Sequence, residues 1–151
     1  MPTLHICLIC HTEGGANALD IGVSSMLRIR EAVEQTTGQP CPLTWALGTF
    51  HATGQLAIFD QYRDRFLALA DRGDEIGLHP HGVVRNGRWD VDPFIAEDTR
   101  LFCAAGFAHP KTFVAGVWTF YPSTLALIEA EGYQVDASVV AGPTPQRKVD
   151  E

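Results

Sequence analysis

The stretch "LAIFDQYRDRFLALADRG" (56–73), followed at once by "DEIGLH" (74–79), decides the fold class of this chain. Apolar side chains recur at helical spacing along the first segment and predict a helix with one buried face: Ile58, Tyr62, Phe66 and Leu69. Gly73 follows as the residue that ends this helix. The short apolar run after it predicts a buried strand. A helix that leads directly into a buried strand is half of a β-α-β unit and indicates a parallel sheet.

The same alternation continues on both sides of this unit. Strands are expected over 3–10, 42–50, 74–79, 111–118 and 134–140, and helices over about 21–35, 56–73, 91–107 and 122–133. Five strands alternating with four helices predict an α/β fold of βα units around a parallel sheet or barrel. We expect one domain over 1–140, followed by a polar, proline-containing and flexible tail over 141–151.

Composition narrows the class of partner. The chain has 151 residues, of which 46% are hydrophobic and 19% charged, as in ordinary globular domains. Its formal net charge is −7, and its 11 basic residues are scattered, so we expect no nucleic-acid partner and no membrane partner. The N-terminal stretch lacks the features of a signal peptide, and no apolar run approaches the roughly 18 residues of a membrane span. We therefore expect a cytoplasmic protein.

The cysteines Cys7 and Cys10 have the C-x-x-C spacing of redox and zinc motifs. They lie inside the apolar run "LHICLIC", and no second C-x-x-C completes a zinc ligand set. A redox pair would lie at the start of a helix after a strand, whereas these thiols lie inside the expected strand. We interpret both as buried structural cysteines.

Histidines and carboxylates gather at the carboxyl ends of the expected strands, where parallel α/β folds place their functional groups. The candidates are His11, Glu13, His51, His79, His81, Trp118 and Asp136. One carboxylate and two or three imidazoles are a ligand set for a divalent transition metal. Such a metal lowers the pKa of water and polarises a carbonyl oxygen. Each residue also has a structural interpretation, since single histidines are common in loops and Asp136 could cap a turn.

The spacing of His79 and His81 bears on this metal site directly. Residues two apart on a strand point to the same side, so the pair could chelate a metal if the strand continues through Pro80. A histidine or carboxylate beside such a metal, with His11 and Glu13 among the candidates, could take the proton from the water. His51, Trp118 and Asp136 are assigned to substrate binding.

Three segments resemble the polysaccharide deacetylase family of metal-dependent carbohydrate deacetylases. "TWALGTFHATGQ" is similar to that family's "ATFFVTGQ" segment, and "ADRGDEIGLHPHG" is similar to its "ARRGHEIGNHTxxH" segment. "TFVAGVWTFYPSTLALIEAEGYQVDASV" resembles "FRAPYG" followed by "LLKELGYxxDSS". The resemblance runs along nearly the whole chain and implies a distorted (β/α) barrel. It also implies hydrolytic removal of an N- or O-acetyl group by metal-activated water.

The resemblance also implies roles for individual residues. The family holds its metal with an aspartate and two histidines, and uses an aspartate as general base and a late histidine as general acid. Glu13 takes the place of the metal-binding carboxylate, and the general-base position falls on His11 or Thr12. His79 matches the first metal histidine. The second would fall on Val83, so that His81 is the nearby substitute. With these matches, the resemblance implies Glu13, His79 and His81 as metal ligands and His11 and Glu13 as catalytic residues. The implied cofactor is a divalent metal ion, with zinc as first choice and nickel or cobalt as alternatives.

The sequence departs from the family at two points, and three hypotheses for its function remain open. Val114 replaces the family's arginine, and the chain ends before the strand that carries the acid histidine. We expect an incomplete barrel of about five strands. Its open edge favours either a homo-oligomer that covers it or a shortened product of a longer ancestral domain. The first hypothesis is a metal-dependent deacetylase or amide hydrolase acting on an acetylated carbohydrate or small amide. The second is an inactive or weak module that binds a metal or sugar or acts through protein–protein association. The third is a structural remnant without a ligand.

Overall fold

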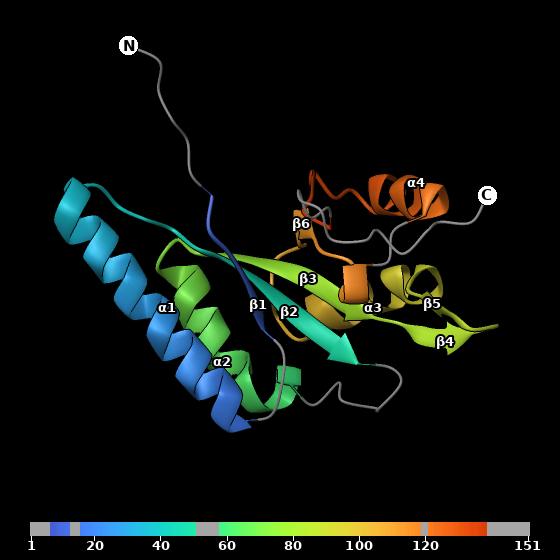
Figure 1. Cartoon of the computed structure of the whole chain (residues 1–151), viewed down its shortest axis with the longest axis horizontal. Coiled ribbons are helices and arrows are strands. Elements are labelled where there is room, and N and C mark those ends of the chain that lie inside the picture. The colour runs from blue at the N-terminus through green and yellow to red at the C-terminus, as the bar shows by residue number, and fades with distance from the viewer. Residues whose placement is uncertain (1–6, 13–15, 51–57, 119–120, 139–151) are drawn as a thin grey trace, which may run out of the picture.

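The computed structural model describes residues 7–12, 16–50, 58–118 and 121–138 (Figure 1). Four α-helices, two short 3₁₀ turns and seven strands follow one another in this part of the chain. Their bounds are β1 (Ile9–Thr12), α1 (Ala16–Thr37), β2 (Thr44–Phe50), α2 (Ile58–Asp71), β3 (Glu75–His81), β4 (Val83–Arg85), β5 (Arg88–Asp90), η1 (Asp92–Phe94), α3 (Ile95–Ala104), β6 (Thr112–Phe113), η2 (Gly116–Trp118), α4 (Pro122–Ala130) and β7 (Val135–Asp136).

The main sheet has five strands in the order β1-β2-β3-β6-β7, and each described pair of neighbours is parallel. The strands therefore lie side by side in the order in which they occur along the chain. This confirms the predicted α/β class and the alternation of strands with helices. The longest pairing joins β2 to β3, from Thr44 opposite Glu75 to Phe50 opposite His81.

The hydrophobic core lies between one face of this sheet and the helices. Trp45 of β2 is buried, and its ring centroid lies 5.9 Å from that of Phe66 on α2. The predicted apolar face of α2 is confirmed for Tyr62, Phe66 and Leu69, which are all buried. Burial of a large apolar side chain such as Phe66 or Leu69 contributes roughly 1.5–3 kcal/mol by removing it from water.

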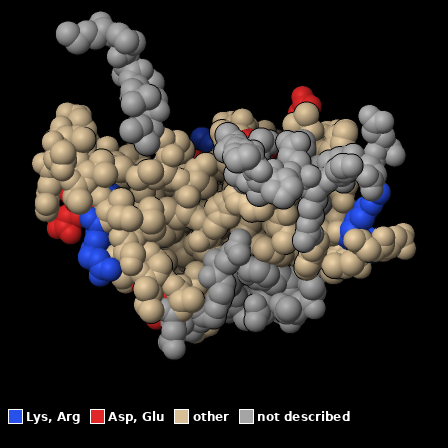
Figure 2. Space-filling view, in the orientation of Figure 1, with Lys and Arg blue, Asp and Glu red and all other residues tan. Residues whose placement is uncertain are grey.

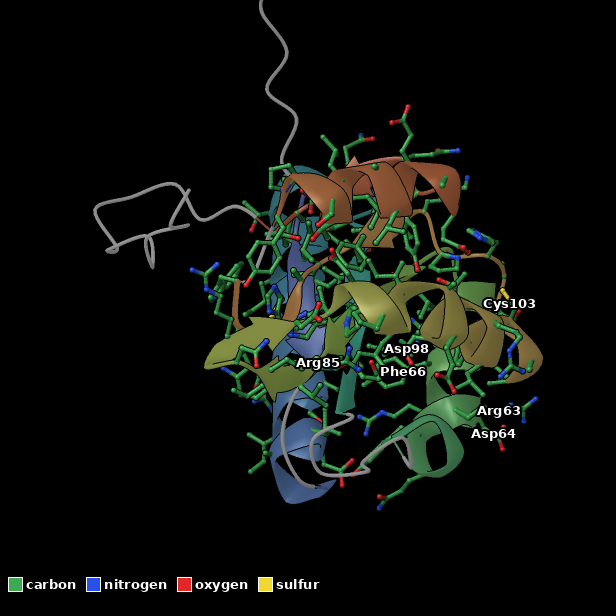
Figure 3. The ribbon with its side chains drawn as sticks, turned by 90° about the vertical axis from the view of Figure 1, so that its right-hand side faces the viewer. Arg63, Asp64, Phe66, Arg85, Asp98 and Cys103 are labelled. Atoms are coloured by element: carbon green, nitrogen blue, oxygen red, sulfur yellow. The ribbon has the colours of Figure 1, made fainter. Side chains whose placement is uncertain are left out.

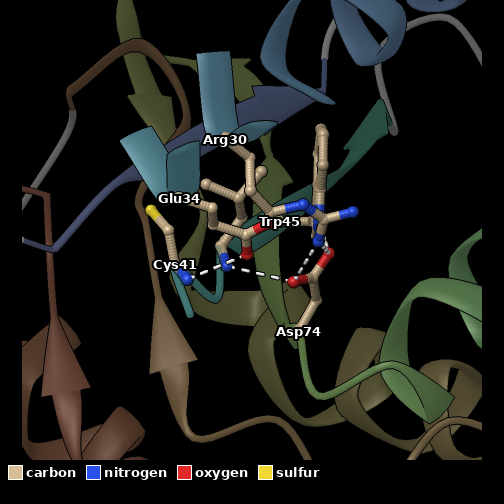
Figure 4. A network of polar contacts seen from close by, with 6 residues as sticks. Arg30, Glu34, Cys41, Trp45 and Asp74 are labelled. Carbon is tan, nitrogen blue, oxygen red and sulfur yellow. Dashed lines mark hydrogen bonds and ion pairs between the residues drawn. The ribbon is translucent and has the colours of Figure 1, made fainter. Parts of the chain in front are cut away.

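A buried ion pair joins α1 to the starts of β2 and β3 (Figure 4). Nη1 of Arg30 donates to both carboxylate oxygens of Asp74 at 2.8 Å. The same carboxylate accepts from the Trp45 indole N–H at 2.9 Å and from the Leu43 backbone N–H at 3.1 Å. Because the side chains of both Arg30 and Asp74 are buried, this network fixes the amino-terminal end of the sheet.

A second buried carboxylate lies between the sheet and α3. Thr49 of β2 donates its hydroxyl to Oδ2 of Asp98 at 2.6 Å, and both residues are fully buried. Figure 3 shows Asp98 and Phe66 toward the interior, whereas Arg63 and Asp64 of α2 lie on the outside. Asp98 thus ties α3 to the carboxyl end of β2.

The hairpin β4–β5 is a feature that the sequence interpretation missed. Val84 of β4 pairs with Trp89 of β5 in an antiparallel two-stranded sheet. Its turn contains Asn86 at φ 50° and Gly87 at φ 77°. Asn-Gly between two strand-forming segments is the strongest short-range signal for such a hairpin, because both residues tolerate positive φ. The signal was therefore present in "VVRNGRWD".

Several predicted boundaries were wrong at their ends. The expected strand over 111–118 is only Thr112–Phe113, and the chain then turns at η2. The helix expected over 91–107 begins with η1 and becomes α-helical only at Ile95. The first helix starts at Ala16, well before the expected residue 21. Within the described residues, none of the helices combines the length and the apolar character needed to cross a membrane.

The cysteine prediction was correct for only one of the two residues. Cys10 is buried in β1, and burial, with a smaller contribution from the charge of Asp74, raises the pKa of its thiol from 9.0 to about 11. Cys7 is exposed, because it precedes the point at which the strand joins the sheet. All four cysteines are free, so the C-x-x-C spacing forms no disulfide.

Basic side chains do not gather into one large patch on the face shown in Figure 2. Lys and Arg side chains appear there as small groups toward opposite ends of the molecule. Scattered charge on this face agrees with the scattered basic residues of the sequence.

Candidate functional site

His79 and His81 point to the same side of β3. The strand continues through Pro80, which lies opposite Thr49 in the register of β2 and β3. Alternate residues of a strand share a face, so the two imidazoles converge. Their Nε2 atoms lie 2.9 Å apart, and the two ring planes meet at 85°. The structure therefore confirms that this H-x-H spacing brings the two side chains together.

The orientation of His79 is fixed by the backbone of the neighbouring segment. Its Nδ1 lies 2.8 Å from the carbonyl oxygen of Val114, and the residue is only 1% exposed. A carbonyl oxygen only accepts hydrogen bonds, so Nδ1 of His79 carries the proton. The lone pair of the neutral ring is then on Nε2, which faces His81. A ligand histidine held by a backbone carbonyl through its other nitrogen is the usual arrangement at metal sites.

His11 joins this pair from β1, although β2 lies between β1 and β3. The ring centroid of His11 lies 4.6 Å from that of His79. On β2, the residues opposite His11 and His79 are Ala46 and Gly48. These small residues leave room for the two imidazoles to approach each other across the middle strand. The sequence prediction that His11 and His79 lie at one end of the sheet is therefore confirmed.

Trp118 extends the cluster beyond His11. The centroids of the two rings lie 5.1 Å apart, and their planes meet at 38°. Trp118 and Val117 are non-glycine residues with positive φ, at 55° and 51°. Left-handed backbone costs roughly 1–2 kcal/mol per residue, and a β-branched residue such as Val117 rarely adopts it. Trp118 therefore reaches His11 from a strained turn.

Gly116 closes the turn against the histidines. A Cβ atom at residue 116 would lie 2.5 Å from the Pro80 carbonyl oxygen and 2.7 Å from Cγ of His81. Only glycine fits this approach without a shift of the backbone. Sequence reasoning missed both Gly116 and the Val114 carbonyl. A glycine inside an apparent strand was a usable signal for the first, whereas a backbone carbonyl leaves no trace in the sequence.

Two other residues considered for the site have structural partners. The Thr12 hydroxyl, an alternative at the general-base position, donates to the Ala46 carbonyl at 2.8 Å and accepts from the Gly48 N–H at 3.2 Å. Oδ1 of Asp136 accepts from both the backbone N–H and the hydroxyl of Ser138. The structure thus gives Asp136 the turn-capping contacts that were its alternative interpretation. Glu13 and His51 lie outside the described residues.

The two Nε2 atoms of the histidine pair lie slightly closer together than two nitrogen ligands of zinc would. Zinc binds imidazole nitrogen at about 2.0–2.1 Å, so two tetrahedral ligands lie roughly 3.3 Å apart. The 2.9 Å between the two Nε2 atoms is close to this value. Among the described residues, no three His, Cys, Asp or Glu side chains are placed to hold a metal ion. A third ligand would have to come from elsewhere, and Glu13 follows β1 directly in the sequence.

Comparison with known proteins does not assign the chain to a family. No family model, curated protein or solved structure matches it. The resemblance to polysaccharide deacetylases therefore remains a prediction from three sequence segments. The histidine cluster and this sequence resemblance are together the basis for a function.

Proposed function

We propose that this chain is a metal-dependent hydrolase that removes an acetyl group from an N- or O-acetylated carbohydrate. The observation that carries the proposal is the convergence of the two Nε2 atoms of His79 and His81 at 2.9 Å. His79 is held for this role by its Nδ1–H, which donates to the Val114 carbonyl. The resemblance to polysaccharide deacetylases supplies the acetyl group and the carbohydrate.

Each side chain of the cluster has a role in this proposal. His79 and His81 hold the metal, preferably zinc, together with Glu13. When bound, such a metal makes water more acidic and polarises the carbonyl group to be attacked. His11 is exposed and adjoins His79, so it accepts the proton from the attacking water. His51, Trp118 and Asp136 remain proposed substrate contacts.

We also propose that the sheet is part of a distorted (β/α) barrel of the deacetylase type. Supporting this, the five strands are parallel and ordered as in the chain. In such barrels the side chains at the carboxyl ends of the strands carry the chemistry. His11 is the second-last residue of β1, and His81 is the last residue of β3.

One observation favours a second candidate function. A distance of 2.9 Å between two imidazole nitrogens is also an ordinary N–H···N hydrogen bond, so the pair is stable without a metal. The second candidate is a catalytically silent module that binds a sugar at the same rim.

Acetate release separates the two candidates. Purified protein would be loaded with one equivalent of Zn²⁺ and incubated with the tetramer of N-acetylglucosamine, with acetate measured enzymatically. The proposal predicts acetate release that is lost in His79→Ala and retained in His109→Ala. His109 lies in the loop before β6, whereas the Val114 carbonyl that holds His79 follows β6. Replacement of His109 should therefore leave the histidine cluster intact. No acetate release from the wild type with this or other acetylated sugars would favour the silent module.

A further inference from the structure

The turn Gly116–Trp118 holds two consecutive non-glycine residues, Val117 and Trp118, in left-handed backbone. Strained backbone of this kind persists only where the surrounding structure determines it, and it concentrates at ligand-binding sites. The turn Gly116–Trp118 is therefore a candidate for a ligand-binding role.

The residues before the turn are fixed on both sides. The Val114 carbonyl accepts from His79, and the backbone N–H of Ala115 donates to the Ser138 hydroxyl at 2.7 Å. Gly116 lies against Pro80 and His81 with no space for a side chain. The backbone of residues 114–116 is therefore held in one conformation beside the histidine cluster.

The strained turn presents an exposed indole beside the cluster. Trp118 is 52% exposed, although its ring contacts His11, and Val117 beside it is 37% exposed. Tryptophan is normally among the well-buried residues. Here the backbone adopts an unfavourable conformation that leaves about half of the side chain in water. A ligand that covers the indole would shield it from water, and the free energy of binding would offset the cost of the backbone conformation.

We infer that Trp118 is a specificity-determining residue that stacks on the sugar ring of an acetylated carbohydrate. This inference rests on the proposed function and identifies what selects cyclic substrates over acyclic acetylated amides. The π-face of an indole is electron-rich and attracts the partly positive C–H groups on one face of a pyranose ring. Because Trp118 contacts His11, and His11 adjoins His79, a sugar ring stacked on the exposed part of the indole is bound at the edge of the histidine cluster.

Intrinsic fluorescence gives a test that does not depend on catalysis. The chain has three tryptophans. Trp45 is buried, Trp89 is half-buried and Trp118 is the most exposed. Metal-free protein would be titrated with the tetramer of N-acetylglucosamine. We expect a saturable blue shift of the emission, because the sugar removes water from Trp118. The shift should disappear in Trp118→Phe and remain in Trp89→Phe.

The affinity of the variants completes the test. Isothermal titration calorimetry measures binding in variants that lack the indole. We expect Trp118→Ala to raise the dissociation constant of the tetramer at least roughly tenfold, and Trp118→Phe to raise it less, because a phenyl ring still stacks. N-acetylputrescine, an acyclic acetylated amine, should leave the emission unchanged. Absence of a shift in the wild type, a shift that persists in Trp118→Phe, or an equal shift with N-acetylputrescine would overturn the inference.

This inference and the proposed function fail in different ways. Sugar binding at Trp118 without acetate release would leave the inference intact and contradict the proposed function. The protein could instead release acetate equally from the sugar tetramer and from N-acetylputrescine, with no change in Trp118→Ala. This result would contradict the inference and leave the proposed hydrolase function standing.

Discussion

Gly116 lies so close to His81 that a Cβ atom at residue 116 would lie 2.7 Å from Cγ of the imidazole. The backbone that follows β6 therefore packs directly on the end of β3. The same segment supplies the Val114 carbonyl that orients His79. One short stretch of chain thus positions both histidines of the candidate metal site.

Gly116→Ala is expected to weaken metal binding. The added methyl group must displace His81 or the Pro80 carbonyl, which should cost about 1–3 kcal/mol of stability. Loss of a supporting contact at a metal ligand typically lowers metal affinity about 10–100-fold. Zinc titration and urea denaturation would measure the two effects.

The matched control for this substitution is Gly22→Ala. A Cβ atom at residue 22, inside α1, would meet nothing within 4 Å. Replacing a helical glycine with alanine should stabilise the protein by about 0.5–1 kcal/mol and leave zinc affinity unchanged. Wild-type zinc affinity in Gly116→Ala would show that the contact does not position His81.

Asp74→Asn is expected to be strongly destabilising. The substitution leaves the buried guanidinium of Arg30 without its counter-charge, and breaking buried pairs in this way costs about 3–5 kcal/mol. Asp64→Asn is the control, because Asp64 forms an exposed ion pair with Arg63 and should change stability by less than about 1 kcal/mol. Urea denaturation of both variants measures the difference, and equal effects would contradict the structural role given to Asp74.

The Cys10 thiol should make stability depend on pH in the alkaline range. Folding raises its pKa from 9.0 to about 11, mainly through burial. Between these values the unfolded chain loses the proton more readily than the folded one, so stability should fall as the pH rises from about 9 to 11. Comparison of urea denaturation at several pH values in wild type and Cys10→Ala isolates this contribution. An identical pH slope in the variant would remove Cys10 as its source.

The same burial predicts a difference in alkylation. At pH 8, iodoacetamide should modify the exposed Cys7 and Cys103 well before Cys10, because only the thiolate reacts. Mass spectrometry of peptides would show the order. Early modification of Cys10 in the folded protein would contradict its burial.

His11→Ala should separate catalysis from metal binding. Loss of a general base typically lowers the rate about 10²–10⁴-fold. Because the contacts of His79 with Val114 and His81 do not involve His11, zinc affinity should stay close to that of the wild type. Acetate release and zinc titration on the same preparation measure both properties. Parallel loss of the two would instead make His11 a metal ligand or a structural residue.

The sequence was sufficient to predict the α/β class because strands and helices alternate and α2 has a regular apolar face. The sequence did not predict the end of β6, because contacts with residues distant in the sequence determine where this strand ends. The apolar run "KTFVAGVW" looks like one strand, yet only Leu78 and Phe113 pair between β3 and β6 before the chain turns at Gly116. Past the end of the strand, the backbone packs against the two histidines: the Val114 carbonyl accepts from His79, and Gly116 lies against His81.

Part of the site was predictable and part was not. Convergence of His79 and His81 follows from their spacing on a strand. The approach of His11 to His79 depends on the order of the strands and on Ala46 and Gly48 between them, which requires the folded sheet. The Val114 carbonyl is a backbone group, and no residue type marks it in advance.

The measurement that tests the central claim most directly is the zinc affinity of the histidine pair. Competition with a chromophoric chelator would compare wild type with His79→Ala and His81→Ala, and with His109→Ala as control. We predict one site per chain in the wild type and in the control, with a dissociation constant at least roughly 100-fold higher in each of the other two variants. Wild-type protein that binds zinc no better than His79→Ala would contradict the account.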